Sequence, residues 1–293
     1  MDSTTDISII EELDSEFGFN QVLSPEVRAE IDRLSRQPYL EYEQVQKCHR
    51  WLYTLVMSRM TGSLVGESRS GKTVACKSFA QKYNQIKTKY KKRIKPIIYI
   101  EIPPNCGSRE FFIKILKVLN KPTNGTVSDL RERTLDGLKI HECEMLIVDE
   151  ANHFKYETFA DVRHVYDEDE LNIAVLLVGT SHRLEAVLKR DEQVINRFLE
   201  MYVMDALDDR EFKQLITAWE KDIIRLPEPS NLAKGENLKL LKRATHKLVG
   251  RLDMILRKSA IRALQKGEKN ITLEILNQTI ASIKWSERRT RNG

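Results

Sequence analysis

GESRSGKT, residues 66–73, is the stretch of sequence that decides the fold. It fits the pattern G-x-x-x-x-G-K-[ST] and lies between a short strand-like run, Ser63–Val65, and a helical stretch near Lys72–Tyr83. This placement matters because the N–H groups of a glycine-rich turn and of the following helix start then face one anion. The segment therefore predicts a phosphate-binding loop.

The residues of this loop are expected to make distinct contacts with a nucleoside triphosphate. Lys72 would reach the β and γ phosphates, and the Thr73 hydroxyl would bind Mg²⁺. The nucleotide-binding residues predicted here are Gly66, Glu67, Ser68, Arg69, Ser70, Gly71, Lys72, Thr73 and Val74.

An acid pair follows the apolar run Met145–Val148. Asp149 would hold magnesium through water, together with Thr73. Glu150 is one residue further, so its side chain would point to the opposite face of the sheet, and it could polarise the attacking water. Such a pair is often only a helix cap, but its place in the same alternation of strands and helices favours the catalytic interpretation.

Three more polar residues are candidates for the same site. Thr180 follows the run Ile173–Gly179, where a strand between the two motifs would place it near the γ phosphate; a turn or cap residue is the alternative. Arg197, with Arg190 as its competitor, could reach a neighbouring subunit's nucleotide, and a surface salt bridge is the alternative for both. Arg251 starts a helix and could close over the phosphates or simply lie at the surface.

Strand-like apolar runs alternate with helical stretches up to about residue 205. The strands expected are Ser63–Val65, Pro96–Ile102, Glu144–Asp149, Ile173–Gly179 and Glu200–Met204. Nearly continuous apolar strands spaced by helices predict an α/β fold with a parallel sheet covered by helices on both faces. Beyond residue 205 only helical spacing follows, which predicts a smaller all-α C-terminal domain.

These patterns divide the chain into four parts. Residues 1–41 are an acidic arm and a helix, which Ser24 caps and Pro25 opens. Residues 42–205 form the nucleotide-binding domain, residues 206–285 an all-α lid domain, and residues 286–293 a basic tail.

Composition excludes several classes of protein. The chain has 293 residues, 41% of them hydrophobic, which is enough for a full core. Its apolar runs fall far short of the roughly 20 residues that span a bilayer, so we expect no membrane segment. Residues 1–20 hold six acids and no base, unlike a secretory leader, which favours a cytoplasmic protein. The four cysteines form no CxxC pair and are expected to be reduced and structural.

Charge is distributed unevenly behind the net charge of +5. Residues 1–43 hold eleven acids and three bases, whereas residues 82–95 hold seven bases and no acid. That basic segment suits a polyanion such as nucleic acid, and a solvated loop face is an equal alternative. Two polar helix starts, within residues 106–111 and 124–131, could grip a DNA backbone without reading bases, or could be simple caps. Their candidate residues are Arg109, Thr126 and Arg131.

Together these motifs resemble the AAA+ ATPases and, more narrowly, the TnsC group of regulators of CRISPR-associated transposons, related to the TniB group. The resemblance covers about residues 25–284. The phosphate loop and the acid pair are generic to NTPases, whereas GTVSDLRERT (residues 125–134) and ETFADVR (residues 157–163) are more specific. Other similar stretches are EMLIVDEA (144–151), VLLVGT (175–180), LKRDEQV (188–194) and GRLDMILR (250–257).

The resemblance implies an ATPase that forms a ring or helical homo-oligomer around double-stranded DNA with ATP and Mg²⁺. It implies contacts with the DNA backbone and a mark on the insertion target. The implied partners are the TnsB transposase, which promotes hydrolysis and disassembly, a TniQ-like target-selection protein and an RNA-guided effector. The resemblance gives Lys72 and Thr73 the phosphate-loop roles, and it gives Asp149 and Glu150 the Walker B roles. It identifies Thr180 as sensor 1, Arg197 as the arginine finger and Arg251 as sensor 2.

Two other functions share the same nucleotide motifs. One is a helicase loader or initiator-type AAA+ protein, which binding to a replicative helicase would favour. The other is a nucleotide-gated scaffold that does not hydrolyse ATP, which phosphate release dependent on Glu150 would exclude.

Overall fold

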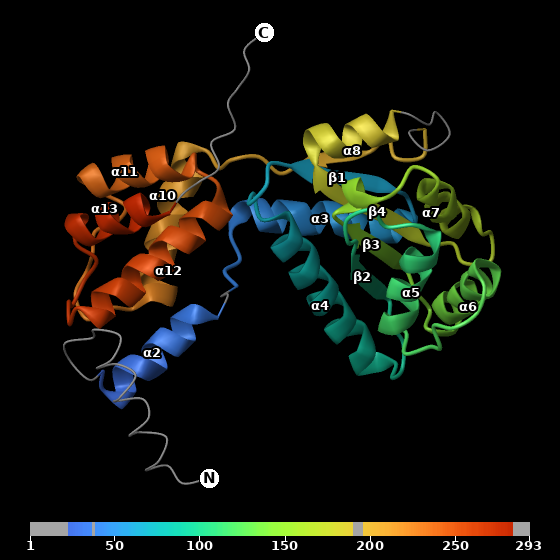
Figure 1. Ribbon diagram of the computed structural model, residues 1–293, viewed down its shortest axis with the longest axis horizontal. Helices are drawn as coiled ribbons and strands as arrows, with labels where there is room; N and C mark the ends of the chain where they lie inside the picture. Colours follow the sequence, from blue (N-terminus) through green and yellow to red (C-terminus); the bar gives the residue numbers. More distant parts are fainter. Residues whose placement is uncertain (1–22, 37–38, 190–195, 284–293) are drawn as a thin grey trace. The chain divides into compact units, whose positions relative to one another are not determined.

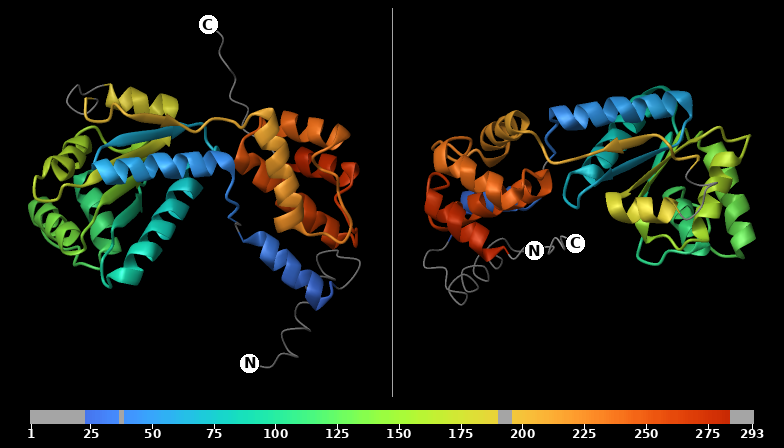
Figure 2. Two further views of the ribbon diagram at one scale, coloured as in Figure 1. Left: turned by 180° about the vertical axis from the view of Figure 1, so that it is seen from behind. Right: turned by 90° about the horizontal axis from the view of Figure 1, so that it is seen from above.

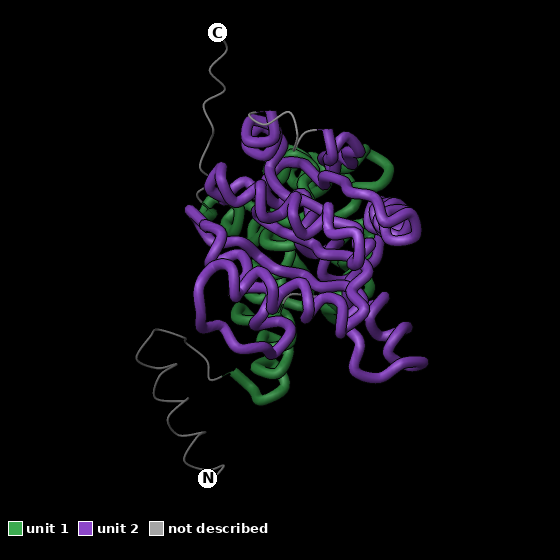
Figure 3. Tube along the Cα trace, turned by 90° about the vertical axis from the view of Figure 1, so that its right-hand side faces the viewer, with its two compact units in different colours: residues 1–40, 207–293 green, residues 41–206 purple. Residues whose placement is uncertain are grey.

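The computed structural model describes residues 23–36, 39–189 and 196–283 of the chain. It divides into two compact units, coloured separately in Figure 3. The α/β unit consists of residues 41–206, and the helical unit consists of residues 1–40 and 207–293.

The α/β unit contains a five-stranded sheet in the order β2-β3-β4-β1-β5, and every strand pair is parallel (Figure 1). The predicted fold class is thereby confirmed. The strands are β1 (Gly62–Gly66), β2 (Ile97–Glu101), β3 (Met145–Asp149), β4 (Ala174–Thr180) and β5 (Met201–Val203).

Helices cover both faces of the sheet, as the apolar runs predicted (Figure 2). Successive strand residues point to opposite faces, so Leu146 and Val148 enter one core and Met145 and Ile147 enter the other. The first core is closed by α5 (Ser108–Val118), α6 (Val127–Ile140), α7 (Thr158–Asp167) and α8 (Ser181–Leu188). The second is closed by α3 (Glu43–Ser58) and α4 (Lys72–Tyr90).

The basic segment of residues 82–95 is not a loop over most of its length. Residues up to Tyr90 form the last turns of α4. Several of its charges are paired within the α/β unit, since Lys87 contacts Glu144 at 3.0 Å and Lys91 contacts Glu142. The segment is therefore partly neutralised by its own chain.

The helical unit is built from five α-helices and one π-helical turn within the described residues. The elements are α2 (Pro25–Ser35), α10 (Asp209–Ala218), η2 (Trp219–Ile224), α11 (Gly235–Thr245), α12 (Val249–Gln265) and α13 (Leu273–Ser282). As predicted, Ser24 caps α2, with its Oγ accepting from the N–H of Val27.

Helix α2 packs against α12 and belongs to the helical unit, although the sequence division set residues 1–41 apart. Leu34 is fully buried there, and Arg257 of α12 donates to the carbonyl oxygens of Leu34 and Ser35. Arg33 donates to the carbonyl oxygen of Ile223 at 2.7 Å. These contacts join segments about 190 or more residues apart in sequence, which no local pattern could indicate.

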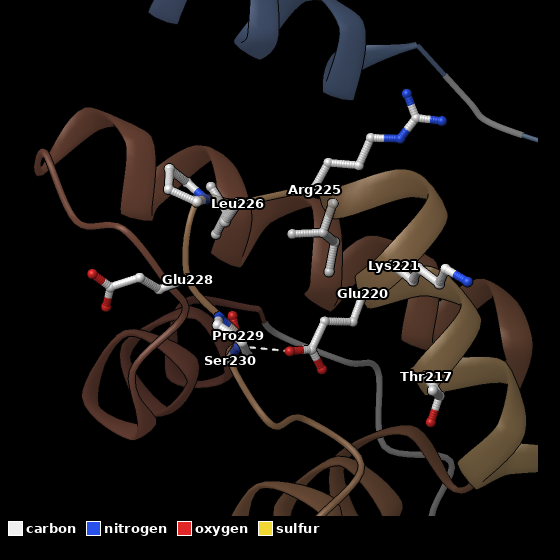
Figure 4. A pocket seen from close by; sticks show the side chains of 10 residues that line it. Thr217, Glu220, Lys221, Arg225, Leu226, Glu228, Pro229 and Ser230 are labelled. Carbon is white, nitrogen blue, oxygen red and sulfur yellow. Dashed lines mark hydrogen bonds between the residues drawn. The ribbon is translucent and has the colours of Figure 1, made fainter.

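A proline-containing loop of the helical unit is anchored by one carboxylate. Figure 4 shows Glu220 pointing at Ser230 beside a hollow of about 360 Å³. Its side chain accepts hydrogen bonds from the N–H groups of Ser230, Asn231 and Leu232, at 2.6, 2.8 and 3.0 Å. The carboxylate thereby satisfies three backbone donors that have no helical partner.

No helix among the described residues has the length and apolarity needed to cross a membrane.

All four cysteines, Cys48, Cys76, Cys106 and Cys143, are buried free thiols. Burial raises the pKa of Cys48 and Cys143 to about 12, which keeps both groups protonated and unreactive.

Candidate nucleotide-binding site

The strand order brings the two predicted motifs to one edge of the sheet. Strand β4 lies between β1, which leads into the phosphate loop, and β3, which ends at Asp149. Gly66 at the end of β1 is paired in register with Thr180 at the end of β4. The carboxyl ends of parallel strands are where open α/β sheets bind ligands.

Two glycines of the loop are required by their surroundings. A Cβ at Gly66 would lie 2.3 Å from the carbonyl oxygen of Met204, which is backbone and cannot move aside easily. Gly71 has a φ of 104° and lies at the N-cap of α4. The side chains of Glu67, Ser68 and Arg69 between them are exposed.

Lys72 lies in the first turn of α4 and is 7% exposed. Its Nζ donates to the carbonyl oxygens of Gly66 at 3.1 Å and Glu67 at 2.7 Å, both in the loop itself. Desolvation lowers its pKa, while the charges of Asp149 and Glu150 act to raise it. The result is a poorly hydrated cation inside a ring of loop backbone, which is what an anionic phosphate would bind.

Asp149 accepts hydrogen bonds from three directions and is 1% exposed. The Thr73 hydroxyl donates to Oδ2 at 2.6 Å, the Tyr99 hydroxyl to the same oxygen at 2.7 Å, and the Glu150 N–H to Oδ1 at 2.8 Å. Burial first, and then Asp149, raise the pKa of Tyr99, so the phenol stays a donor. The predicted metal ligands Thr73 and Asp149 are thus brought into direct contact, with a fixed carboxylate orientation.

Asn152 links the acid pair to β4. It lies in η1 (Ala151–His153), directly after Glu150, which adopts a left-handed conformation with φ 56°. The Asn152 amide nitrogen is 3.5 Å from Glu150 Oε2, and its amide oxygen accepts from the N–H of Thr180 at 3.2 Å. A Cβ on Gly179 would lie 2.5 Å from that amide oxygen, so only glycine leaves room for the bridge.

The side chains present fit a magnesium–triphosphate. The Thr180 hydroxyl oxygen is buried at this edge with no hydrogen-bond partner among the described residues, although a buried polar atom normally has one. Lys72 and the loop N–H groups would hold the phosphates, and Thr73 with Asp149 would hold the metal, which neutralises charge on the transferred phosphoryl group. Glu150 could accept a proton from an attacking water, and Thr180 could donate to the γ phosphate.

Arg197, predicted to reach the nucleotide of a neighbouring subunit, and Arg251, predicted to close over the phosphates, lie in different units. Arg197 lies in the α/β unit, where it makes a two-pronged ion pair with Asp167, at 2.7 and 2.8 Å. Arg190, its competitor, lies outside the described residues. Arg251 lies in the first turn of α12, in the helical unit. Their catalytic roles stay predictions.

The three predicted DNA contacts gather around the start of α6, and each is engaged with its own chain. Arg109 is exposed and donates to the carbonyl oxygen of Gly125 at 2.6 Å. Thr126 forms a capping box with Asp129, which is the capping role considered as its alternative. Arg131 pairs at 2.7 Å with Asp161, which is 5% exposed. Arg109 and Thr126 still face solvent, whereas Arg131 is held in a structural ion pair.

Tyr99 and Asn152 are site residues that the sequence motifs did not indicate. Tyr99 is paired with Ile147 in the β2–β3 register. Ile147 lies two residues before Asp149 in β3, so all three side chains point to the same face of the sheet. A strand-register argument could have found Tyr99. Asn152 depends on a turn geometry that no spacing announces.

The family described as Bacterial TniB protein matches residues 30–206, more than half of the chain. The chain belongs to the TniB family. A comparison with curated proteins found no match.

Solved structures similar to this TniB family member include ORC and Cdc6 proteins. ORC2 of Aeropyrum pernix, in its ADPNP–ADP complexes, has a TM-score of 0.65 and 15% identity, with 85% of this chain and 71% of that chain covered. Cdc6p of Pyrobaculum aerophilum has a TM-score of 0.67 and 19% identity over 85% and 70%. ORC1 of Aeropyrum pernix, in complex with DNA, has a TM-score of 0.67 and 12% identity over 83% and 66%. At these identities the likeness shows a shared fold.

Proposed function

We propose that this protein is an ATPase that assembles on double-stranded DNA when it binds ATP and Mg²⁺, and that regulates transposition. In this proposal ATP holds neighbouring copies in a ring or helical homo-oligomer. Hydrolysis then releases them. The chain positions and activates other proteins and does not cut DNA.

The observation that carries the proposal is the Thr73–Asp149 contact at 2.6 Å in a TniB chain. It joins the phosphate loop to the acid of β3 across the strand that ends in Thr180. That arrangement supports binding and hydrolysis of a nucleoside triphosphate. Glu150 is the proposed base, Arg197 the proposed finger toward a neighbouring copy, and Arg251 the proposed lid contact.

DNA binding and the partners are finer parts of the same proposal. ORC1 of Aeropyrum pernix was solved with DNA, and its fold is similar to that of this chain. Exposed Arg109 and Thr126 are proposed to contact phosphates from the start of α5 and the N-cap of α6. The TnsB transposase, a TniQ-like protein and an RNA-guided effector are the proposed partners.

The test is duplex binding with ATP, a non-hydrolysable ATP analogue, ADP or no nucleotide, at several salt concentrations. We expect tight binding only with ATP or its analogue, with affinity falling steeply as salt rises because phosphate contacts release counterions. Affinity that does not depend on nucleotide would contradict the proposal.

An initiator or helicase-loader role is the second candidate, and the ORC and Cdc6 structures favour it. Binding to a replicative helicase, with no effect on a transposase, would select that role. A scaffold without hydrolysis is the third. Phosphate release that disappears in Glu150→Gln would exclude it.

A further inference from the structure

A groove of about 640 Å³ opens between α3 and α4, on the outer side of the helix layer that covers one face of the sheet. Among the residues that the structure describes, its lining comes from these two helices and from Glu41 just before them. The nucleotide site uses only the first turn of α4. The groove is therefore a separate feature of the α/β unit.

The floor and walls of the groove are apolar and aromatic. Phe79 is buried at its base, with its ring centroid 5.9 Å from that of Tyr83. The walls are exposed, since Tyr53, Met57 and Ile86 are 50%, 65% and 51% accessible. Large apolar side chains left open around one hollow are typical of a binding groove.

The rim of the groove carries excess positive charge. Of the described lining residues, Arg50, Lys82 and Lys87 are basic and one, Glu41, is acidic. The side chains of Lys82 and Lys87 stay 61% and 45% exposed, even though each contacts a carboxylate. An occupant should therefore combine apolar anchors with acidic residues, and basic segments are disfavoured.

We propose that this groove binds the chain's own N-terminal segment, residues 6–19. That segment, DISIIEELDSEFGF, holds five acids, no base and six large apolar residues. Ile10, Leu13 and Phe17 follow the i, i+3, i+7 spacing with which amphipathic helices fill apolar grooves. Its charge and its anchors match the groove on both counts.

The chain is long enough for this contact. Glu41, at one end of the groove, is joined to residue 19 by α2, whose eleven residues span about 16 Å. Residues 20–23 and 36–40 on its two sides can extend to roughly 14 Å and 17 Å. Because these two flanks together exceed the length of α2, residue 19 can return to Glu41 whichever way the helix points.

A labelled peptide of residues 6–19 tests the proposal by fluorescence anisotropy, with full-length protein free of nucleotide and DNA. In a variant whose own segment is disabled, Leu13→Ser with Phe17→Ser, we expect the peptide to bind at least 10-fold more tightly than to the unaltered chain. The intact segment competes at an effective concentration that tethering places near the millimolar range. Equal binding by both proteins would overturn the proposal.

Groove variants provide the matched control. In the disabled background, Met57→Glu with Ile86→Glu should weaken peptide binding at least 10-fold, because both changes oppose the acidic segment. Ile140→Glu, a similarly exposed position on α6, should leave it unchanged. If Met57→Glu with Ile86→Glu changed peptide affinity no more than Ile140→Glu does, the peptide would bind at another site and the proposal would be overturned.

A disulfide distinguishes the chain's own segment from that of a second copy. With Leu13→Cys and Ile86→Cys, mild oxidation should give a cross-link within one chain, seen on a non-reducing gel as a monomer that migrates faster than the same protein after reduction. The four native thiols are buried, so they should not interfere. Dimeric product alone would show exchange between copies and contradict the committed occupant, and Leu13→Cys with Ile140→Cys is the negative control.

Discussion

The nucleotide edge of the sheet and the surface around the start of α6 use polar residues in opposite ways. At the sheet edge, side chains from β2 and α4 converge on Asp149 of β3, and the Thr180 hydroxyl is buried without a partner among the described residues. Around α6, Arg109, Thr126 and Arg131 each bond to a nearby group of their own chain. The first arrangement leaves the buried Thr180 hydroxyl without a hydrogen-bond partner among the described residues. In the second, each of the three residues makes at least one such contact, and the Nε of Arg131 is the buried atom left without one.

This difference suggests different roles for the two regions: catalysis at the sheet edge, and binding at the surface around the start of α6. Buried polar groups need partners, so a ligand at the sheet edge gains interactions that water cannot easily supply. Exposed groups such as Arg109 exchange a local bond for a phosphate contact with a small net gain. Substitutions should therefore have large effects on nucleotide binding and turnover at the sheet edge and small, graded effects on DNA binding around α6.

The largest effect is expected for Lys72→Ala. It removes the buried cation of the phosphate loop, so nucleotide affinity should fall by roughly 100-fold or more, as expected for a lost charge-assisted contact. ATP-dependent DNA binding should disappear with it. Isothermal titration with an ATP analogue measures the loss, and an unchanged melting profile would show that the fold is intact. Nucleotide affinity within threefold of that of the unaltered chain would break the comparison.

Glu150→Gln should separate binding from hydrolysis. The amide cannot accept the proton from water, so phosphate release should fall by about 10²-fold or more, while ATP still binds. We expect the DNA-bound state to persist in this variant. Equal DNA binding by Glu150→Gln and Lys72→Ala would contradict the assigned roles.

Asn152→Ala should reduce turnover by about tenfold at unchanged ATP affinity, because the Asn152 side chain contacts Glu150 and the Thr180 N–H and so positions the proposed base. The comparison of kcat with KM in a phosphate-release assay measures this. Asn152→Asp, which places a second carboxylate beside Glu150, should be slower still. A change in KM alone would remove Asn152 from this role.

Around α6, Arg109→Ala should weaken duplex binding about threefold, equally for unrelated sequences, because a backbone contact carries no base information. Arg131→Ala should instead lower stability by roughly 2 kcal/mol, because it leaves the buried carboxylate of Asp161 unpaired. The affinity of Arg109→Ala for duplexes of several sequences checks the first prediction, and urea unfolding of Arg131→Ala checks the second. A sequence-dependent loss in Arg109→Ala would indicate base readout.

The last prediction concerns the stability contribution of Glu144, which lies outside both regions. Desolvation acts to raise its pKa, but hydrogen bonds from Lys87, Arg59 and Tyr83 outweigh it and lower the pKa. A lowered carboxyl pKa gives stability that is complete above the ordinary glutamate pKa and is lost as pH falls through the folded-state pKa. Glu144→Gln should cost about 1–2 kcal/mol at pH 7, and this cost should shrink as the pH falls through the folded-state pKa. A cost that grows on acidification would be contrary to this sign.

The parallel sheet could be predicted because its signal is local. The apolar runs at β3 and β4 differ by one residue at most from the observed strands, since buried strands read as continuous hydrophobic stretches. Helix α8 was missed because its eight residues begin directly after Thr180, with no loop to separate strand from helix. The grouping of α2 with α12 was missed because the contact spans more than 200 residues.

The candidate site was predictable to the extent that it lies within motifs. The phosphate loop and Asp149 each carry a spacing rule, and the contact between Thr73 and Asp149 follows from the strand order. Tyr99 and Asn152 act through register and turn geometry, which appear only once the strands are aligned. The Arg197–Asp167 pair likewise joins residues that share no motif.

The central claim is that ATP joins copies of this chain into an assembly around duplex DNA. Sedimentation velocity of the full chain with a short duplex, with and without a non-hydrolysable ATP analogue, tests it most directly. The account predicts large protein–DNA particles only when both ligands are present, and none for Lys72→Ala under the same conditions. Monomers in every mixture, or particles of the same size without nucleotide, would contradict it.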